Sequence, residues 1–178
     1  MKLQRLSGVC AAMPFDAIST VSAIRPGRVA NLQVAAIPVR QLGGAPQVLL
    51  VTTRGQGAWI APKGWPAGDY PDCESARREA FEEAGLLGRV EPYSLGSYTY
   101  WKGAAKKRAY FQVHAFALDV ERELRDWPER KVRKRCWFSP ETAAKLVSNA
   151  ELGALILRAA HGVRARVFSP GVPTSPLC

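Results

Sequence analysis

The sequence predicts an α/β or α+β fold built around one mixed sheet. Three observations support this: strand-like and helical patterns alternate along the chain, nearly half of the residues are apolar, and no apolar run is long. The chain has 178 residues, 47% of them hydrophobic, which allows a sizeable core in a chain of single-domain length. A membrane-spanning helix needs about 18 to 20 consecutive apolar residues, and no such run is present. We therefore expect no membrane partner.

The composition divides the chain into three parts. Residues 1–28 show no steady hydrophobic period and contain Pro14 and Pro26, so we expect a loosely ordered N-terminal arm. Residues 29–162 carry the alternating strand and helix patterns and form the predicted domain. The remaining segment, 163–178, contains three prolines and is expected to be a disordered C-terminal tail.

Strands are predicted where short apolar segments are bounded by turn residues. A loop with Gly43 and Gly44 splits the first two segments, and Pro62 ends the third. The stretch from Pro62 to Pro71 is a loop by composition. The predicted strands cover residues 34–39, 48–52, 58–61, 93–101, 109–118 and 136–138.

The first predicted helix follows this loop. Asp72 is its expected N-cap, and the helix over 73–84 is expected to end at Gly85. Its apolar residues have the spacing of one helical face. They are Ala76, Ala80, Phe81 and Ala84.

Two further helices are predicted near the C-terminal end. Ser139 followed by Pro140 is typical of an N-cap with proline at the first helical position, so a second helix should run to about residue 147. A third helix is expected over residues 151–160. Because both helices follow the last predicted strand, they are available to cover one face of the sheet.

The first helix carries Glu79, Glu82 and Glu83, which project from one side because they stand three and four residues apart. Like charges at this spacing repel by roughly a few tenths of a kcal/mol per pair in water. A hard cation such as Mg²⁺ or Mn²⁺ would offset this repulsion, because it prefers oxygen ligands. On spacing alone, a solvated acidic face with Arg77 and Arg78 as partners is the simpler interpretation.

The loop and the first helix together match a motif of fixed spacing. Gly64 is followed, after the required interval, by the nine residues Arg78–Leu86, which read Arg-Glu-apolar-x-Glu-Glu-x-Gly-apolar. Tyr70 stands where the motif has an earlier glutamate. With this one exception, the sequence resembles the Nudix hydrolase superfamily, in which that glutamate braces the loop and the helix. The resemblance implies an α/β/α sandwich with a central mixed sheet and a loop–helix catalytic motif.

Segments outside this motif extend the resemblance over about residues 34–147. They are similar to the diphosphoinositol polyphosphate phosphohydrolase branch, which also hydrolyses diadenosine polyphosphates. The resemblance implies hydrolysis of a phosphoanhydride bond in a polyphosphorylated small molecule, and it allows a homodimer because many Nudix domains dimerise. The matching segments are Val48–Arg54, Trp59–Pro62, Glu83–Gly88, Asp126–Trp127 and Arg133–Phe138.

The resemblance also assigns roles to individual residues. Arg78 would orient the glutamates through charge-assisted hydrogen bonds. Glu82 is the implied general base, and Glu129 is the alternative, because some Nudix enzymes take this group from a distant loop. The implied ligands of a Mg²⁺ or Mn²⁺ ion are Glu79, Glu83, Glu82 and the carbonyl oxygen of Lys63.

Basic residues are the implied contacts of the substrate phosphates. The formal net charge of +10 favours anionic partners. A solvated basic face explains the clusters of lysine and arginine in the sequence equally well. Four aromatic residues (Trp65, Tyr98, Tyr100 and Trp101) either stack on an adenine or pack in the core and at its rim, and packing is the simpler interpretation. The implied substrate-binding residues are Lys63, Gly64, Thr53, Arg54, Lys106, Lys107, Arg108 and Arg133.

Other functions stay open at this point. The substrate of a Nudix enzyme can also be an RNA 5′ end, ADP-ribose or a nucleoside triphosphate. Tyr70 leaves room for a catalytically silent Nudix domain that binds a phosphorylated ligand. A nucleic-acid-binding protein with an accidental motif is not favoured. Residues 1–6 include the basic Lys2 and Arg5 but are not followed by the long apolar stretch of an export signal, so a cytoplasmic location is expected.

Overall fold

The computed structural model describes residues 31–103 and 108–167, with side chains up to residue 162. The predicted N-terminal arm, Lys106, Lys107 and the last eleven residues lie outside this part. The last helix continues to Val167, beyond the expected start of the tail at residue 163. The division into arm, domain and tail stays a prediction.

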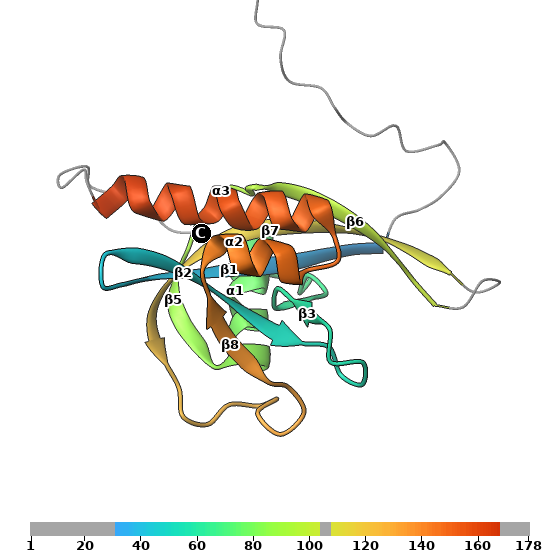
Figure 1. The fold of residues 1–178 in the computed structure, drawn as a ribbon. Helices are drawn as coiled ribbons and strands as arrows, with labels where there is room; N and C mark the ends of the chain where they lie inside the picture. Colours follow the sequence, from blue (N-terminus) through green and yellow to red (C-terminus); the bar gives the residue numbers. More distant parts are fainter. Residues whose placement is uncertain (1–30, 104–107, 168–178) are drawn as a thin grey trace, which may run out of the picture.

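Eight strands of the described residues form one mixed sheet (Figure 1). They are β1 (Asn31–Leu42), β2 (Ala45–Thr52), β3 (Trp59–Ile60), β4 (Lys63–Gly64), β5 (Leu86–Val90), β6 (Gly96–Lys102), β7 (Ala109–Glu123) and β8 (Arg135–Phe138). The main path runs β3-β2-β1-β7-β5, while β4 pairs with β1, β6 with β7 and β8 with β2. Only β1 and β7 are parallel among these pairs.

Three helices cover the two faces of the sheet. They are α1 (Asp72–Ala84), α2 (Pro140–Leu146) and α3 (Ala150–Val167). Figure 1 shows α2 and α3 on one face and α1 on the other, which confirms the α/β/α sandwich. Within the described ranges, no helix has the length and apolar character needed to cross a membrane.

Strand β1 lies between two hydrophobic cores. Its side chains alternate between the faces of the sheet, as strand geometry requires. Ala35, Ile37 and Val39 pack toward α2 and α3, whereas Val34 and Ala36 pack toward α1. All five are fully buried. Because β4 pairs with the first half of β1, the central strand fixes the position of β4 beside α1.

Two strands were not predicted. Strand β4 has only two residues, Lys63 and Gly64, inside a stretch that reads as a loop, and its pairing with β1 depends on residues far away in the chain. Strand β5 begins immediately after α1 and contains Gly88. A Cβ atom at Gly88 would lie 2.0 Å from the carbonyl oxygen of Asp119, so the close approach of β5 and β7 requires glycine there.

The predicted ends of α1 were half right. Gly85 ends the helix in the left-handed conformation (φ 63°), as expected, and its N–H donates to carbonyls of the last turn. The prediction of Asp72 as N-cap was wrong. Pro71 occupies that position, no side chain caps the helix, and Asp72 is the first helical residue. At α2, Ser139 is confirmed as the N-cap because its Oγ accepts the N–H of Thr142.

Candidate functional site

Glu79 and Glu83 lie on the buried side of α1, against strand β4. They are one helical turn apart and 9% and 3% exposed. A Cβ atom at Gly64 would lie 2.2 Å from Glu79 Oε1, so only glycine leaves room for this carboxylate. The backbone N–H of Lys63 donates to Glu83 Oε2 at 3.2 Å. Strand β4 thus faces both carboxylates.

Burial disfavours the ionised form of both carboxyl groups. It raises the pKa of Glu79, and the nearby charge of Glu82 raises it further. Burial also raises the pKa of Glu83 to about 7, while the guanidinium of Arg133 and the N–H of Lys63 oppose this rise. A buried carboxylate of this kind favours a nearby cation.

The donor set fits a hard divalent cation that keeps other oxygen ligands. Within the described ranges, no three carboxylate, imidazole or thiol groups converge closely enough to hold a metal ion by themselves. Glu79 and Glu83 would therefore be joined by the carbonyl oxygen of Lys63, by water or by substrate phosphates. Mg²⁺ is usually bound in this way, through one or two carboxylates and substrate oxygens.

Glu82 and Arg78 lie at the outer edge of α1. Arg78 Nε is 3.2 Å from Glu82 Oε1, and these side chains are 51% and 38% exposed. The positive charge of Arg78 also lowers the pKa of Glu79, opposing the effect of burial. The structure thus separates the three glutamates into two buried ones and one that faces solvent beside an arginine.

Arg133, which lies just before β8, forms a nearly buried ionic cluster with Glu83 and Glu129. The three side chains are 8%, 4% and 17% exposed. Arg133 donates to Glu83 Oε1, from Nε to Glu129 Oε2 at 2.5 Å, and to the carbonyl of Thr52 at 2.9 Å. The exposed Arg54 also pairs with Glu129. Against the effect of burial, the hydrogen bonds from Arg54 and Arg133 lower the pKa of Glu129.

The side chain of Lys63 is tied to the neighbouring strands. Its Nζ donates to Gln33 Oε1 on β1 at 3.0 Å and to the hydroxyl of Tyr100 on β6 at 2.9 Å. The Tyr100 hydroxyl in turn donates to Gln33 Oε1. Burial lowers the pKa of Lys63 to about 8, assisted by the charges of Lys102 and Arg133 and opposed by Glu83. The ammonium group is therefore held between β1 and β6.

Comparison with known proteins identifies the family. The model of the NUDIX domain matches residues 31–158. The chain belongs to the Nudix family. Its relatives include Nudix hydrolase 12, mitochondrial, of Arabidopsis thaliana, 36% identical over 107 residues (56% of this chain, 51% of the relative). Diphosphoinositol polyphosphate phosphohydrolase 3-beta of Bos taurus is 36% identical over 104 residues (57% and 60%). The chain spans about half the length of the curated relatives it matches.

Solved Nudix structures confirm the fold. The binary complex of a C. elegans Ap4A hydrolase superposes with a TM-score of 0.56 at 21% identity, covering 77% of this chain and 99% of that one. The NUDIX domain of Shewanella oneidensis NrtR, complexed with ADP ribose, has a TM-score of 0.58 at 16% identity (79% and 94%). At these identities the likeness concerns the fold alone. Nudix hydrolases generally use divalent metal ions.

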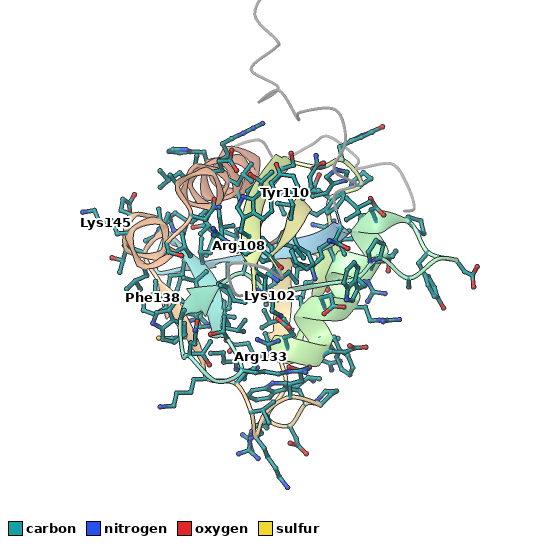
Figure 2. All side chains as sticks on the ribbon, turned by 90° about the vertical axis from the view of Figure 1, so that its right-hand side faces the viewer. Lys102, Arg108, Tyr110, Arg133, Phe138 and Lys145 are labelled. Carbon is teal, nitrogen blue, oxygen red and sulfur yellow. The ribbon has the colours of Figure 1, made fainter. Side chains whose placement is uncertain are left out.

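The predicted phosphate contacts of this Nudix domain are spread over several elements. Thr53 accepts the N–H of Ala58 through its Oγ1 at 3.1 Å and so closes a turn. Arg108 is exposed, and its guanidinium lies 5.7 Å from the ring centre of Trp101. Figure 2 shows Arg108 and Lys102 near the middle of one side of the molecule, with Arg133 below them. Within the described part, neither Arg108 nor Thr53 joins the ionic contacts of α1.

The aromatic residues of the Nudix domain divide into packed and exposed ones. Tyr98 is 3% exposed and belongs to the core, where burial raises the pKa of its hydroxyl. Tyr100 stacks on Phe111 with ring centres 4.9 Å apart. Trp65 and Trp101 are 56% and 40% exposed. Packing therefore accounts for the two tyrosines, while the two tryptophans present surface to solvent.

Residues to which the sequence analysis assigned no individual role hold the C-terminal end of the Nudix helix. Trp127 Nε1 donates to the carbonyl of Glu83 at 3.2 Å. Arg135 donates to the carbonyls of Ala84 and Leu124, and its guanidinium lies 3.9 Å from the ring centre of Trp127. These partners are 44 and 51 residues from the helical carbonyls, so no local pattern reveals them. We refer to Trp127 and Arg135 as the helix clamp.

The loop that carries Tyr70 is held by another side chain. Tyr70 is 62% exposed, and its backbone N–H donates to the carbonyl of Ala67 at 3.0 Å. The buried Ser75 on α1 accepts the N–H of Ala67 at 3.1 Å. The loop therefore keeps a hydrogen bond to α1 even though tyrosine replaces the first glutamate of the Nudix motif.

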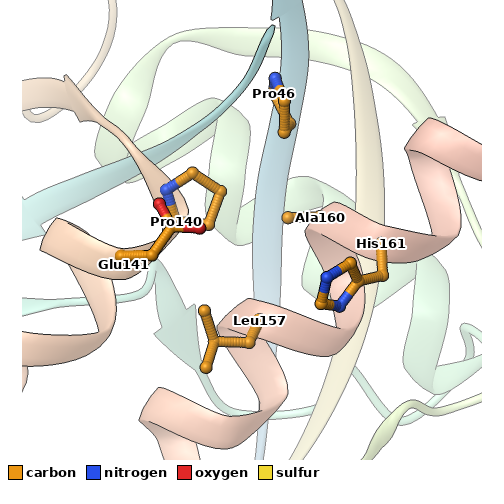
Figure 3. A pocket seen from close by; sticks show the side chains of 6 residues that line it. All are labelled: Pro46, Pro140, Glu141, Leu157, Ala160 and His161. Atoms are coloured by element: carbon orange, nitrogen blue, oxygen red, sulfur yellow. The ribbon is translucent and has the colours of Figure 1, made fainter.

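A shallow hollow lies elsewhere on the Nudix domain (Figure 3). It is formed between α2, α3 and the start of β2, on the face of the sheet opposite α1. None of the predicted site residues lines it. Its lining residues are Pro46, Pro140, Glu141, Leu157, Ala160 and His161.

Proposed function

We propose that this Nudix domain hydrolyses a phosphoanhydride bond in a polyphosphorylated small molecule, using Mg²⁺ or Mn²⁺. The proposal rests on one observation: Glu79 and Glu83 are buried together against Gly64, where a Cβ atom would collide with a carboxylate. A divalent cation, when bound, neutralises phosphate oxygens and acidifies a water molecule. The desolvated pair of carboxylates supplies the charge that such a cation needs.

The charged residues near the start and end of the catalytic motif have separate proposed roles. Glu79, Glu83 and the carbonyl oxygen of Lys63 would hold the cation, with Glu82 as a further ligand. Glu82 is half exposed, so it is accessible to water and accepts the proton of the attacking water as general base. Arg78 keeps Glu82 in place through their 3.2 Å ion pair. Catalysis in this scheme comes mainly from positioning and electrostatic stabilisation.

Several basic groups are proposed to bind the phosphates. The ammonium group of Lys63 is bonded to Gln33 and Tyr100 and is the most firmly positioned of them. Lys106, Lys107 and Arg108 are proposed to reach the substrate from the segment before β7. The backbone of Gly64 and the segment Thr53–Arg54 complete the proposed binding residues, with Arg133 considered separately below.

The proposed substrate is a diadenosine polyphosphate or a diphosphoinositol polyphosphate. Both classes are named among the similar proteins, one by the Ap4A hydrolase of C. elegans and the other by the Bos taurus enzyme. The exposed rings of Trp65 and Trp101 offer surfaces on which an adenine can stack, which favours the dinucleotide of the two.

The test measures product release from a substrate panel in the presence of Mg²⁺ or Mn²⁺. The panel contains diadenosine tetraphosphate, a diphosphoinositol polyphosphate, ADP-ribose, a nucleoside triphosphate and a triphosphorylated RNA. We expect metal-dependent cleavage of one of the first two, lost in Glu83→Gln and retained in Glu121→Gln, which changes an exposed glutamate on β7. Fastest cleavage of another panel member would replace the proposed substrate.

Binding without turnover would contradict the enzymatic proposal. If a polyphosphate binds and no member of the panel is cleaved with either metal, the domain is a silent Nudix module that recognises a phosphorylated ligand. Cation binding by Glu79 and Glu83 can still be measured in that case, for example from the electron paramagnetic resonance of Mn²⁺. The two outcomes are therefore distinguishable with the same preparation.

Location and assembly stay predictions. The cytoplasmic location was expected from the residues at the start of the sequence, whereas several similar plant proteins are named mitochondrial or chloroplastic. The homodimer is expected only from the family resemblance. Fractionation of the native cells and light scattering of the purified chain would test the two predictions separately.

A further inference from the structure

The guanidinium of Arg133 donates hydrogen bonds to three protein groups. One nitrogen donates to Glu83 Oε1, Nε donates to Glu129 Oε2, and the remaining nitrogen donates to the carbonyl of Thr52. Only 8% of the side chain is exposed. A contact with a substrate phosphate would require donors that face solvent. Three of the five N–H donors are bonded to neighbours in the protein, and the low exposure of the side chain keeps the other two from solvent.

The carboxylate of Glu83 is held from two directions. Arg133 donates to Oε1, and the backbone N–H of Lys63 donates to Oε2. Each carboxylate oxygen can accept more than one interaction, so both oxygens keep capacity for a cation. Because a planar guanidinium imposes a fixed geometry on its partner, the two donors together fix the rotation of the carboxyl group.

Arg133 is itself fixed by the segment before β8. Glu129 accepts the bond from its Nε, and the backbone N–H of Glu129 donates to the carbonyl of Glu82 on α1 at 3.0 Å. Thr52, at the end of β2, holds the opposite side of the guanidinium. The arginine is therefore anchored to the helix, to β2 and to its own segment, and it cannot reach outward without breaking several bonds.

We propose that Arg133 is a positioning residue that orients the cation-binding carboxylate of Glu83, and that it does not bind the substrate phosphates directly. This inference rests on the proposed function, because it assumes that Glu83 binds the cation. It differs from the role that the family resemblance implied. Partners that orient a metal ligand commonly change metal affinity by about 10- to 100-fold when they are removed.

The experiment measures Mn²⁺ affinity without substrate, and then kcat and KM with diadenosine tri- and tetraphosphate. The variants are Arg133→Gln and Arg133→Lys, with Arg130→Gln as matched control, since Arg130 is in the same segment and 59% exposed. For Arg133→Gln we expect Mn²⁺ binding to weaken about tenfold or more. We also expect a lower kcat and a nearly unchanged KM for both substrates, with partial rescue in Arg133→Lys.

Two results would overturn the inference. One is Mn²⁺ affinity in Arg133→Gln that equals or exceeds that of the wild type. The other is a KM that rises more for the substrate with more phosphates while Mn²⁺ affinity stays constant, which is the behaviour of a phosphate contact. If Arg133→Gln does not fold, as judged by circular dichroism, the Mn²⁺ affinity of Arg133→Lys decides by the same criterion.

Failure of the proposed function is separable from failure of this inference. A wild-type protein that binds Mn²⁺ but cleaves nothing contradicts the enzymatic proposal, while the Mn²⁺ affinities still decide the role of Arg133. A wild-type protein that does not bind Mn²⁺ overturns both, and this is seen before any variant is made.

Discussion

The two ends of α1 are held in different ways. At the N-terminal end, Pro71 is the N-cap and no side chain caps the helix, while Asp72 and Glu74 lie in the first turn. At the C-terminal end, Gly85 closes the helix and the helix clamp, Trp127 and Arg135, bonds to its last carbonyls.

The electrostatics of a helix explain the difference. Carboxylates are favourable at the N-terminal end, where the helix dipole is positive, and unfavourable at the C-terminal end. Glu82 and Glu83 occupy the unfavourable end, and the last turn contains no basic residue. Arg135 from β8 supplies the missing positive charge. The site thus carries a local electrostatic cost, which tertiary contacts offset.

The largest expected effect comes from filling the space in front of Glu79. In Gly64→Ala, the new Cβ atom would lie 2.2 Å from Glu79 Oε1, so the carboxylate of Glu79 must move from its place. We expect activity to fall by about 100-fold, because misplacement by about 1 Å can have this effect. Gly68→Ala is the control, because a Cβ atom there meets nothing within 4 Å. Equal activity of the two variants would show that the packing of Glu79 is unimportant.

The next effect is a pH dependence that originates at Glu83. Its pKa is raised to about 7 in the folded protein, above the ordinary value of the unfolded chain. Protonated Glu83 therefore adds to the free energy of unfolding. This contribution is present at pH 4 and is lost as the pH rises through 7, by at most about 3 kcal/mol. Urea unfolding of the wild type in EDTA should show this decline. Glu83→Gln should show a smaller decline, and an identical pH slope would contradict the assignment.

A smaller loss of stability is expected when the helix clamp is broken. Arg135→Gln leaves the carbonyl of Ala84 without its donor, which should cost about 1–3 kcal/mol in the free energy of unfolding. Denaturant unfolding measures this change, and Arg89→Gln is the control because Arg89 is an exposed arginine on β5. Similar stability of the two variants would argue that the last turn of α1 needs no outside donor.

The smallest effect is expected at the N-terminal end of α1. Because Asp72 is not the cap, Asp72→Ala should lose its favourable interaction with the helix dipole and its 3.5 Å contact with His114 Nδ1, together about 0.5 kcal/mol. Ser139→Ala removes a true N-cap from α2 and should cost about 1 kcal/mol. Thermal unfolding of the two variants compares them directly. A larger loss in Asp72→Ala would restore Asp72 as a cap.

Short-range features of the fold were predictable from the sequence. The Nudix motif lies within the 23 consecutive residues from Gly64 to Leu86, and the end of α1 at Gly85 and the cap at Ser139 each depend on residues within a few positions of one another. Most strands of the two cores were visible because alternating or continuous apolar runs mark them, whereas β5, which supplies Leu86, was missed. The N-cap of α1 was misplaced by one residue because an aspartate in the first turn resembles a capping aspartate.

Contacts between distant segments were not predictable. Gln33 and Lys63 are 30 residues apart, and Glu83 and Arg133 are 50 apart. No periodicity links such positions, because their proximity depends on how strands pair within the sheet. The sequence therefore indicated the candidate side chains for the proposed chemistry, whereas the partners that hold Glu83, Lys63 and the end of α1 required the structure.

The parallel pairing of β1 with β7 has a consequence for how the protein folds. This pairing joins Asn31 to Phe111, so it closes a long loop that contains α1 and β4. Closing a long loop is entropically costly, and folding dominated by such distant pairings is slow. Helix α1 can form early from local interactions, but β4 reaches its carboxylates only after β1 is placed. In refolding, we expect the helical signal to recover before the ability to bind a cation.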